Sequence, residues 1–148
     1  MRYLLFCLVF FSSNVLAARI AIIIDDIGYR QSDKAVLALP ANVTLSVLPL
    51  TPLGKSVAIQ AHQRGSEILV HLPMQALNGK AIGPGALTNT MSEQDFKLQL
   101  AQAIDSLPFA IGANNHMGSL LTQLNEPMHW VMDTLLARNI NFIDSVTT

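Results

Sequence analysis

The chain has 148 residues, of which 51% are hydrophobic and 13% are charged, and its formal net charge at pH 7 is −1. This length suits one domain, and the composition supports a buried core and excludes an intrinsically disordered chain. Nucleic-acid-binding proteins favour a clustered excess of Lys and Arg, which this sequence lacks, so we expect no nucleic-acid partner.

The N-terminus is typical of a secretory signal peptide. Arg2 supplies a short basic region, residues 3–11 are an apolar run, and residues 15–17 (Val-Leu-Ala) fit the small-x-Ala pattern of a cleavage site. A membrane anchor is the alternative, but a spanning helix needs about 20 apolar residues and this run is shorter. We therefore expect residues 1–17 to be removed, which leaves residues 18–148 as a periplasmic or otherwise exported domain without a transmembrane anchor.

Strand-like and helix-like segments alternate after the signal peptide. Residues 20–24 predict a strand buried on both faces, because every side chain in this run is apolar. Pro40 and Gly65 are stop signals after two predicted helices, and Pro127 suits the first position of another. The expected elements, in chain order, are strand 20–24, helix 32–39, strand 43–48, helix 52–64, strand 67–71, loop 72–91, helix 92–106, strand 110–113, helix 127–138 and strand 141–143.

A long segment, residues 72–91, separates the third predicted strand from the next helix. It is interrupted by glycine and proline, and a loop of this length in a compact domain is usually functional or mobile. Ser92 and Asp95 then have the spacing of a capping box, which predicts that the helix begins at this point.

The order of the elements predicts an α/β fold with a parallel sheet and right-handed crossovers. An open doubly wound sheet and a (β/α) barrel share this pattern, and hydrophobic periodicity does not separate them. A barrel needs about eight strands, and the sequence ends at Thr148, shortly after the fifth. We therefore expect a barrel that is truncated after its fifth strand.

Polar residues fall at the predicted C-terminal ends of the strands, where such folds place their active sites. A single Asp in this place more often caps the next turn, and a single His is more often a hydrogen-bonded buried histidine. The grouping favours a functional site, because it repeats at four strands. The residues concerned are Asp25, Asp26, His71, Asn115, His116 and Asp144.

Asp26, His71 and His116 together supply one carboxylate and two imidazoles at one end of the predicted sheet. This ligand set suits Zn²⁺, or another first-row divalent metal, with an open position for water. The neighbouring Asp25 is then available to take a proton. Glu67 either supports the ligands or faces solvent at the start of its strand.

The remaining histidines, His62 and His129, and the single Trp130 fall in predicted helices, where we expect surface or packing roles.

The chain resembles the divergent polysaccharide deacetylases, a branch related to NodB-type carbohydrate esterases. The resemblance implies a distorted (β/α) barrel of the glycoside hydrolase and deacetylase type, with metal-dependent removal of N- or O-acetyl groups from polysaccharides. It is carried by residues 22–28 (Ile-Ile-Ile-Asp-Asp-Ile-Gly), 71–74 (His-Leu-Pro-Met), 115–119 (Asn-His-Met-Gly-Ser) and 142–145 (Phe-Ile-Asp-Ser).

The resemblance also implies roles for single residues. The Asp-Asp motif of the parent family is similar to Asp25-Asp26, with the first Asp as general base and the second as metal ligand. Its Gly-x-Glu-Ile-x-x-His motif is similar to residues 65–71, which makes His71 the first metal histidine. Asn115, Ser119, Asp144 and Glu67 are then expected to contact the substrate or to support the ligands.

The sequence departs from the parent family at several positions. The parent motif has a second histidine four residues after the first, where this chain has Gln75, and we expect His116 to replace that ligand. The next parent motif carries an Arg, where this chain has the segment 115–119. The parent's general-acid histidine would lie beyond residue 148.

Two functions follow as expectations. The first is a metal-dependent deacetylase that acts on an envelope polysaccharide or a peptidoglycan-type glycan. The alternative is a non-catalytic glycan-binding or regulatory envelope protein that retains the barrel and the metal site. An aspartyl-phosphate phosphatase is disfavoured, because it needs Asp-x-Asp after the strand and this chain has Asp25-Asp26.

Overall fold

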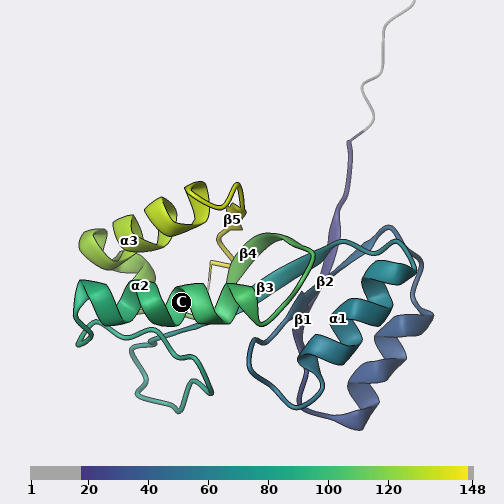
Figure 1. Cartoon of the computed structure of the whole chain (residues 1–148), viewed down its shortest axis with the longest axis horizontal. Coiled ribbons are helices and arrows are strands. Elements are labelled where there is room, and N and C mark those ends of the chain that lie inside the picture. The colour runs from purple at the N-terminus through teal and green to yellow at the C-terminus, as the bar shows by residue number, and fades with distance from the viewer. Residues whose placement is uncertain (1–17, 147–148) are drawn as a thin grey trace, which may run out of the picture.

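Five parallel strands form one sheet, and their order in space is their order in the chain (Figure 1). The structure, a computed structural model, describes residues 18–146, so the expected signal peptide lies outside the described residues. The predicted parallel α/β fold is confirmed. The strands are β1 (Ile22–Ile27), β2 (Val43–Val47), β3 (Ile68–Met74), β4 (Ala110–Met117) and β5 (Asn141–Ile143).

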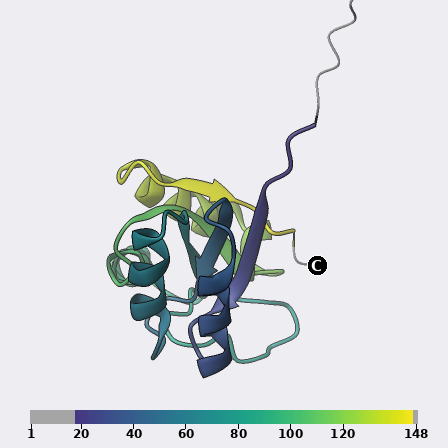
Figure 2. The same cartoon turned by 90° about the vertical axis from the view of Figure 1, so that its right-hand side faces the viewer.

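The helical segments lie against one face of this sheet. A doubly wound sheet reverses its strand order and has helices on both faces, whereas an unreversed order with right-handed crossovers places every connection on the same side, as in a barrel wall. Figures 1 and 2 show this arrangement from two directions. The connecting segments are η1 (Gln31–Ala38), α1 (Gly54–Gln63), α2 (Glu93–Asp105), η2 (Leu121–Gln123) and α3 (Asn125–Leu136).

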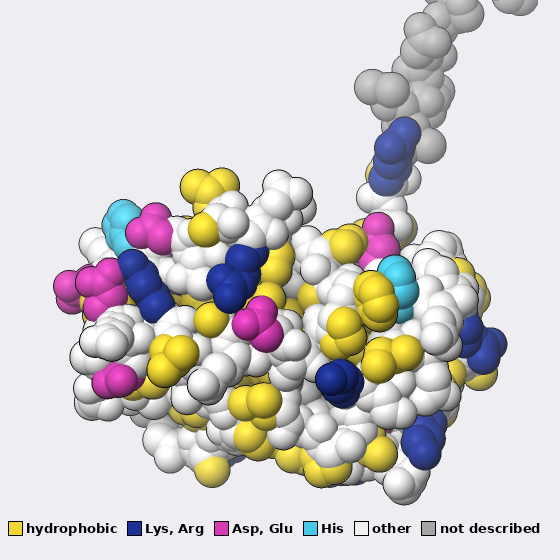
Figure 3. Space-filling view, viewed as in Figure 1, with side chains coloured by type: hydrophobic (Ala, Val, Ile, Leu, Met, Phe, Trp, Pro, Cys, Tyr) yellow, Lys and Arg dark blue, Asp and Glu magenta, His cyan; other side chains and the backbone are white. Residues whose placement is uncertain are grey.

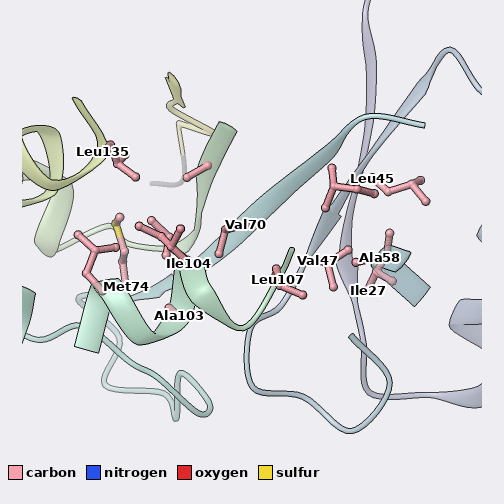
Figure 4. Packing of buried hydrophobic residues seen from close by; sticks show 14 of the residues in the cluster. Ile27, Leu45, Val47, Ala58, Val70, Met74, Ala103, Ile104, Leu107 and Leu135 are labelled. Atoms are coloured by element: carbon pink, nitrogen blue, oxygen red, sulfur yellow. The ribbon is translucent and has the colours of Figure 1, made fainter. Parts of the chain in front are cut away.

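A single hydrophobic core fills the space between the helices and the sheet. Alternate residues of a strand point to opposite faces, and β3 directs Ile68, Val70, Leu72 and Met74 into this core. Figure 4 shows Val70 and Met74 beside α2 and α3, with Leu45 and Val47 of β2 nearer α1. Buried side chains of α1, α2 and α3 complete the core, namely Val57, Ala58, Ala61, Phe96, Leu100, Ala103, Ile104, Val131 and Leu135.

The sheet is strongly curved. β1 and β4 are separated by two intervening strands, which in a flat sheet would place them about 14 Å apart. Asp25 of β1 nevertheless accepts a hydrogen bond from Asn114 of β4 over 2.9 Å. The face opposite the helices is therefore concave, and side chains from distant strands meet on it.

The expectation that the first strand is buried on both faces is wrong. β1 is an edge strand, and Ile22 and Ile24 are 53% and 36% exposed. β1 also extends to Ile27, so Asp25 and Asp26 lie within the strand instead of following it. An apolar run shows that a segment can be a strand, but the number of neighbours it acquires depends on the sheet.

The fourth strand is longer than expected. β4 runs to Met117, so Asn115 and His116 lie inside it, because it pairs in register with β3 as far as Met74. α3 begins at Asn125, which makes Pro127 its third residue and not its first. Proline is tolerated there because the first four N–H groups of a helix have no intrahelical partner.

Two further expectations about helices are confirmed. Gly65 follows the end of α1 with φ +93°, the left-handed conformation expected after a helix. The segment after residue 31 is helical, although it is a 3-10 helix.

No helix of residues 18–146 is long and apolar enough to cross a membrane. Figure 3 shows that charged side chains of both signs are interspersed with hydrophobic ones on the face carrying α1 and α2.

Ser92 caps α2 as predicted. Its hydroxyl oxygen accepts a hydrogen bond from the Asp95 main-chain N–H over 3.2 Å, and the hydroxyl donates to the Asp95 carboxylate over 2.7 Å. We expect Ser92→Ala to lower the free energy of unfolding by about 1 kcal/mol, because a helix N–H loses its partner. Urea denaturation would measure this, with Ser92→Thr as the control that keeps a capping hydroxyl. Equal stability of the alanine variant and the parent would contradict the assignment.

Candidate active site

Asp26, His71 and His116 converge from three strands at one end of the sheet. Asp26 Oδ1 lies 3.1 Å from His71 Nε2 and 2.8 Å from His116 Nδ1. The two imidazole nitrogens are 3.3 Å apart. These three atoms form one compact group that could hold a metal ion.

A β-bulge brings both adjacent carboxylates to this group. Ile24 pairs with Leu45 and Ile27 pairs with Val47, so two residues of β1 stand opposite the single Ser46 of β2. The extra residue is Asp26, whose φ of +63° is left-handed. In a regular strand Asp25 and Asp26 would point to opposite faces, whereas the bulge turns Asp26 toward the histidines.

Asn114 holds the other side of His71. Its Oδ1 accepts a hydrogen bond from His71 Nδ1 over 2.9 Å, which assigns the ring hydrogen to Nδ1. His71 Nε2 then carries a lone pair that faces Asp26 and His116. Neutral Nδ1-protonated histidine is the form in which Nε2 can bind a metal.

Burial favours the neutral form of His71. His71 is 3% exposed, and burial lowers its pKa below the usual value, although the bond to Asn114 and the Asp25 carboxylate act in the opposite direction. Its unprotonated Nε2 therefore lies against a carboxylate oxygen and another imidazole nitrogen. The close approach of these three atoms requires either a hydrogen on His116 Nδ1 or a cation between them.

The distances fit a divalent metal. Ligand atoms about 2.1 Å from one ion lie roughly 3.0 Å apart at right angles and roughly 3.4 Å apart at tetrahedral angles. Two of the three observed separations, 3.1 and 3.3 Å, lie in this range, and the third, 2.8 Å, is slightly shorter. One carboxylate and two imidazoles occupy one side of such an ion and leave positions open.

An open cavity of about 320 Å³ lies over the group. A second cavity of about 420 Å³ shares Asp25, Asp26 and His116 with it and extends toward Tyr29 and Arg30. The loop that carries these two residues is held by Asp33, whose carboxylate accepts hydrogen bonds from the main-chain N–H groups of residues 28, 29 and 30. Those bonds oppose the effect of burial, and the pKa of Asp33 is lowered.

Comparison with known proteins decides the family. A family model described as divergent polysaccharide deacetylase matches residues 22–148. The chain belongs to the divergent polysaccharide deacetylase family. The resemblance inferred from the sequence is thereby confirmed, over nearly all of the described residues.

Two relatives that match most of the chain are uncharacterized proteins. The chain is 41% identical over 137 residues to the uncharacterized protein YibQ of Escherichia coli (strain K12). It is 34% identical over 131 residues to an uncharacterized protein of Haemophilus influenzae. These matches cover 92% and 88% of this chain but 43% and 47% of the relatives, so the chain spans less than half of their length.

A solved structure shares the fold. The uncharacterized protein ATU2773 from Agrobacterium tumefaciens C58 matches with a TM-score of 0.83, over 92% of this chain and 57% of that protein. The sequence identity is 24%, so this likeness shows the fold alone.

Two of the four residues expected to contact the substrate or support the ligands lie at the cavity, and two do not. Asn115 and Ser119 line the cavity over the cluster. Asp144 is exposed and outside the cavity lining, and its carboxylate accepts a hydrogen bond from the Val146 main-chain N–H. Glu67 precedes β3 and lies at the opposite end of the strands, where its carboxylate accepts a hydrogen bond from Thr44. Of the two roles expected for Glu67, the structure shows the second, in which it faces solvent at the start of its strand.

Gln75, which stands where the parent motif has a second histidine, is not among the residues that line the cavity over the cluster. Its side-chain oxygen accepts a hydrogen bond from the Asn89 main-chain N–H over 2.8 Å. Its main-chain oxygen accepts from the N–H groups of Leu120 and Leu121. Gln75 thus ties the long loop and the segment after β4 to the end of β3.

The sequence prediction missed Ser46, Asn114 and Ser145. Asn114 bonds to Ser46 and Ser145 as well as to Asp25 and His71, and Ser145 lines the cavity. The only available signal was position, because Asn114 and His116 are two residues apart and share a strand face.

Proposed function

We propose that this chain carries the metal-binding and base-bearing part of a deacetylase that acts on an envelope polysaccharide or a peptidoglycan-type glycan. The observation that carries the proposal is the cluster of Asp26, His71 and His116 beside Asp25, which lies outside the cluster and accepts a hydrogen bond from Asn114. Family membership supports polysaccharide as the substrate class. Export by a cleaved signal peptide belongs to the same proposal.

Asp26, His71 and His116 would hold the ion, and Zn²⁺ suits one oxygen and two nitrogen ligands. A divalent ion supplies Lewis-acid chemistry, since it polarises a carbonyl group and increases the acidity of water. The open cavity over the three side chains would admit an acetylated sugar. Asn115 and Ser119 would contact that sugar from the cavity wall.

Asp25 is positioned to act as general base. Its Oδ1 accepts the hydrogen bond from Asn114, and its side chain is 39% exposed and lines the cavity. A carboxylate that is fixed through one oxygen can take the proton of an attacking water through the other.

A specific observation favours the non-catalytic alternative. Among the described residues that line the cavity, Asp25 and the three side chains of the cluster are the titratable ones. The lining of this cavity therefore offers no acid, apart from these four groups, to protonate the leaving amine or alcohol. A protein that binds a glycan and a metal without turnover would have this composition.

Asp25→Asn separates the two functions. We expect this variant to lose about 10²–10⁴-fold in acetate release from an acetylated glycan, because a general base contributes a factor of that size. Zn²⁺ affinity should change little, since Asp25 is not in the cluster. Acetate release and metal affinity would be measured on the same preparations.

Asp105→Asn is the matched control, because Asp105 is an exposed carboxylate that forms an ion pair with Arg138 over 3.6 Å and lies outside the cavity lining. Turnover by the parent chain that survives Asp25→Asn would rule out Asp25 as the base. Glycan binding with no turnover in the parent chain would support the non-catalytic alternative.

A further inference from the structure

Asn114 is the most connected polar side chain on the concave face. It is 2% exposed and lies in the middle of β4. Its four hydrogen bonds reach β1, β2, β3 and the segment after β5. The partners are Asp25, Ser46, His71 and Ser145.

The orientation of the Asn114 amide is fixed by its partners. A carboxylate only accepts hydrogen bonds, so the group that faces Asp25 must be the donating Nδ2. Oδ1 then faces the Ser46 hydroxyl and His71 Nδ1, and both of these must donate. Each lone pair of Oδ1 and each hydrogen of Nδ2 is used, and the flipped amide would set an oxygen against the Asp25 carboxylate.

We infer that Asn114 is a positioning residue that sets two properties of the site at once. Through Oδ1 it selects the His71 tautomer whose Nε2 lone pair faces Asp26 and His116. Through Nδ2 it fixes the Asp25 carboxylate. The second part rests on the proposed function, in which Asp25 is the base, whereas the first part stands on the geometry of His71.

The two ends of the amide can be tested separately. Asn114→Leu has a similar volume and removes both interactions. Asn114→Asp retains an oxygen acceptor for His71 Nδ1 but replaces the donor to Asp25 with a second carboxylate. Ser46→Ala is the matched control, because it removes one hydrogen bond to Asn114 Oδ1 and leaves those to His71 and Asp25.

Long-range ¹H–¹⁵N NMR on the metal-free chain reports the tautomer of His71 directly. The sequence contains four histidines to assign. We expect His71 to be protonated at Nδ1 in the parent chain, in Ser46→Ala and in Asn114→Asp. Asn114→Leu should show a mixture of tautomers. A parent His71 protonated at Nε2, or an unchanged tautomer in a folded Asn114→Leu chain, would overturn the inference.

Zn²⁺ affinity and acetate release give the second readout. Asn114→Leu should bind Zn²⁺ about 10–100-fold more weakly, as expected when the partner of a ligating histidine is removed. Asn114→Asp should bind Zn²⁺ within a few-fold of the parent and lose acetate release. Equal acetate release by Asn114→Asp and the parent would refute the role toward Asp25.

The outcomes also separate this inference from the proposed function. A parent chain that has the Nδ1 tautomer but does not bind Zn²⁺ would overturn the metal-dependent function and leave the control of the tautomer standing. Should Asn114→Leu not fold, the tautomers of the parent and of Asn114→Asp decide the inference.

Discussion

His116→Ala is expected to weaken Zn²⁺ binding by at least about 100-fold. Loss of a residue that only supports a ligand costs about 10–100-fold in affinity, and loss of the ligand itself should exceed this. His116 Nδ1 lies 2.8 Å from Asp26 Oδ1 and 3.3 Å from His71 Nε2, so its removal opens one side of the group. Competition against a chromophoric chelator would measure the dissociation constant.

His116 is preferred to His71 for this test because His116 is partly exposed, whereas removal of the buried His71 would leave a cavity. His62→Ala is the matched control. His62 is exposed, and its ring stacks on Phe109 with the centroids 4.1 Å apart, outside the cluster. Equal losses of affinity in the two variants would mean that the cluster is not the binding site.

Zn²⁺ is expected to raise the thermal stability of the parent chain. An ion that binds the folded state alone stabilises it by about 2.7 kcal/mol at a free concentration of 100 times Kd, which corresponds to a shift in Tm on the order of 5–10 °C. The ligands come from β1, β3 and β4, so the ion would link strands that are distant in the sheet. Calorimetry with and without Zn²⁺ would measure the shift.

The control for this experiment is His116→Ala, which should show a much smaller shift at the same Zn²⁺ concentration. A chelator should reverse the shift in the parent chain. If Zn²⁺ stabilised both chains equally, the ion would be acting elsewhere than at the cluster of Asp26, His71 and His116.

Much of the fold was predictable from local patterns. Gly65 and Ser92 marked helix ends correctly, because such signals depend on a few neighbouring residues. The exposure of β1 was not predictable in this way, since it depends on which strands pair with it. The length of β4 was missed because Asn114, Asn115 and His116 are polar, although alternate residues of a strand that ends at a site can be polar without ending the strand.

The candidate cluster was predictable as a set of residues but not as an arrangement. Asp26, His71 and His116 were identified because carboxylates and imidazoles recur where parallel strands end. The bulge that turns Asp26 toward the histidines depends on the pairing of β1 with β2, which the sequence of β1 does not reveal. Asn114 was missed because the residues after 113 were interpreted as a loop, although Asn114 lies two residues before His116 on the same strand face.

The alternation of core and site along β3 and β4 has a consequence for insertions and deletions. His71 lies between the core residues Val70 and Leu72, and Asn114 follows the buried Ala113. A slip of one residue would turn His71 and Asn114 into the apolar layer and the aliphatic side chains out of it, so stability and chemistry would fail together. These two strands can therefore accept substitutions one position at a time, but a change in their length would have to come in pairs of residues.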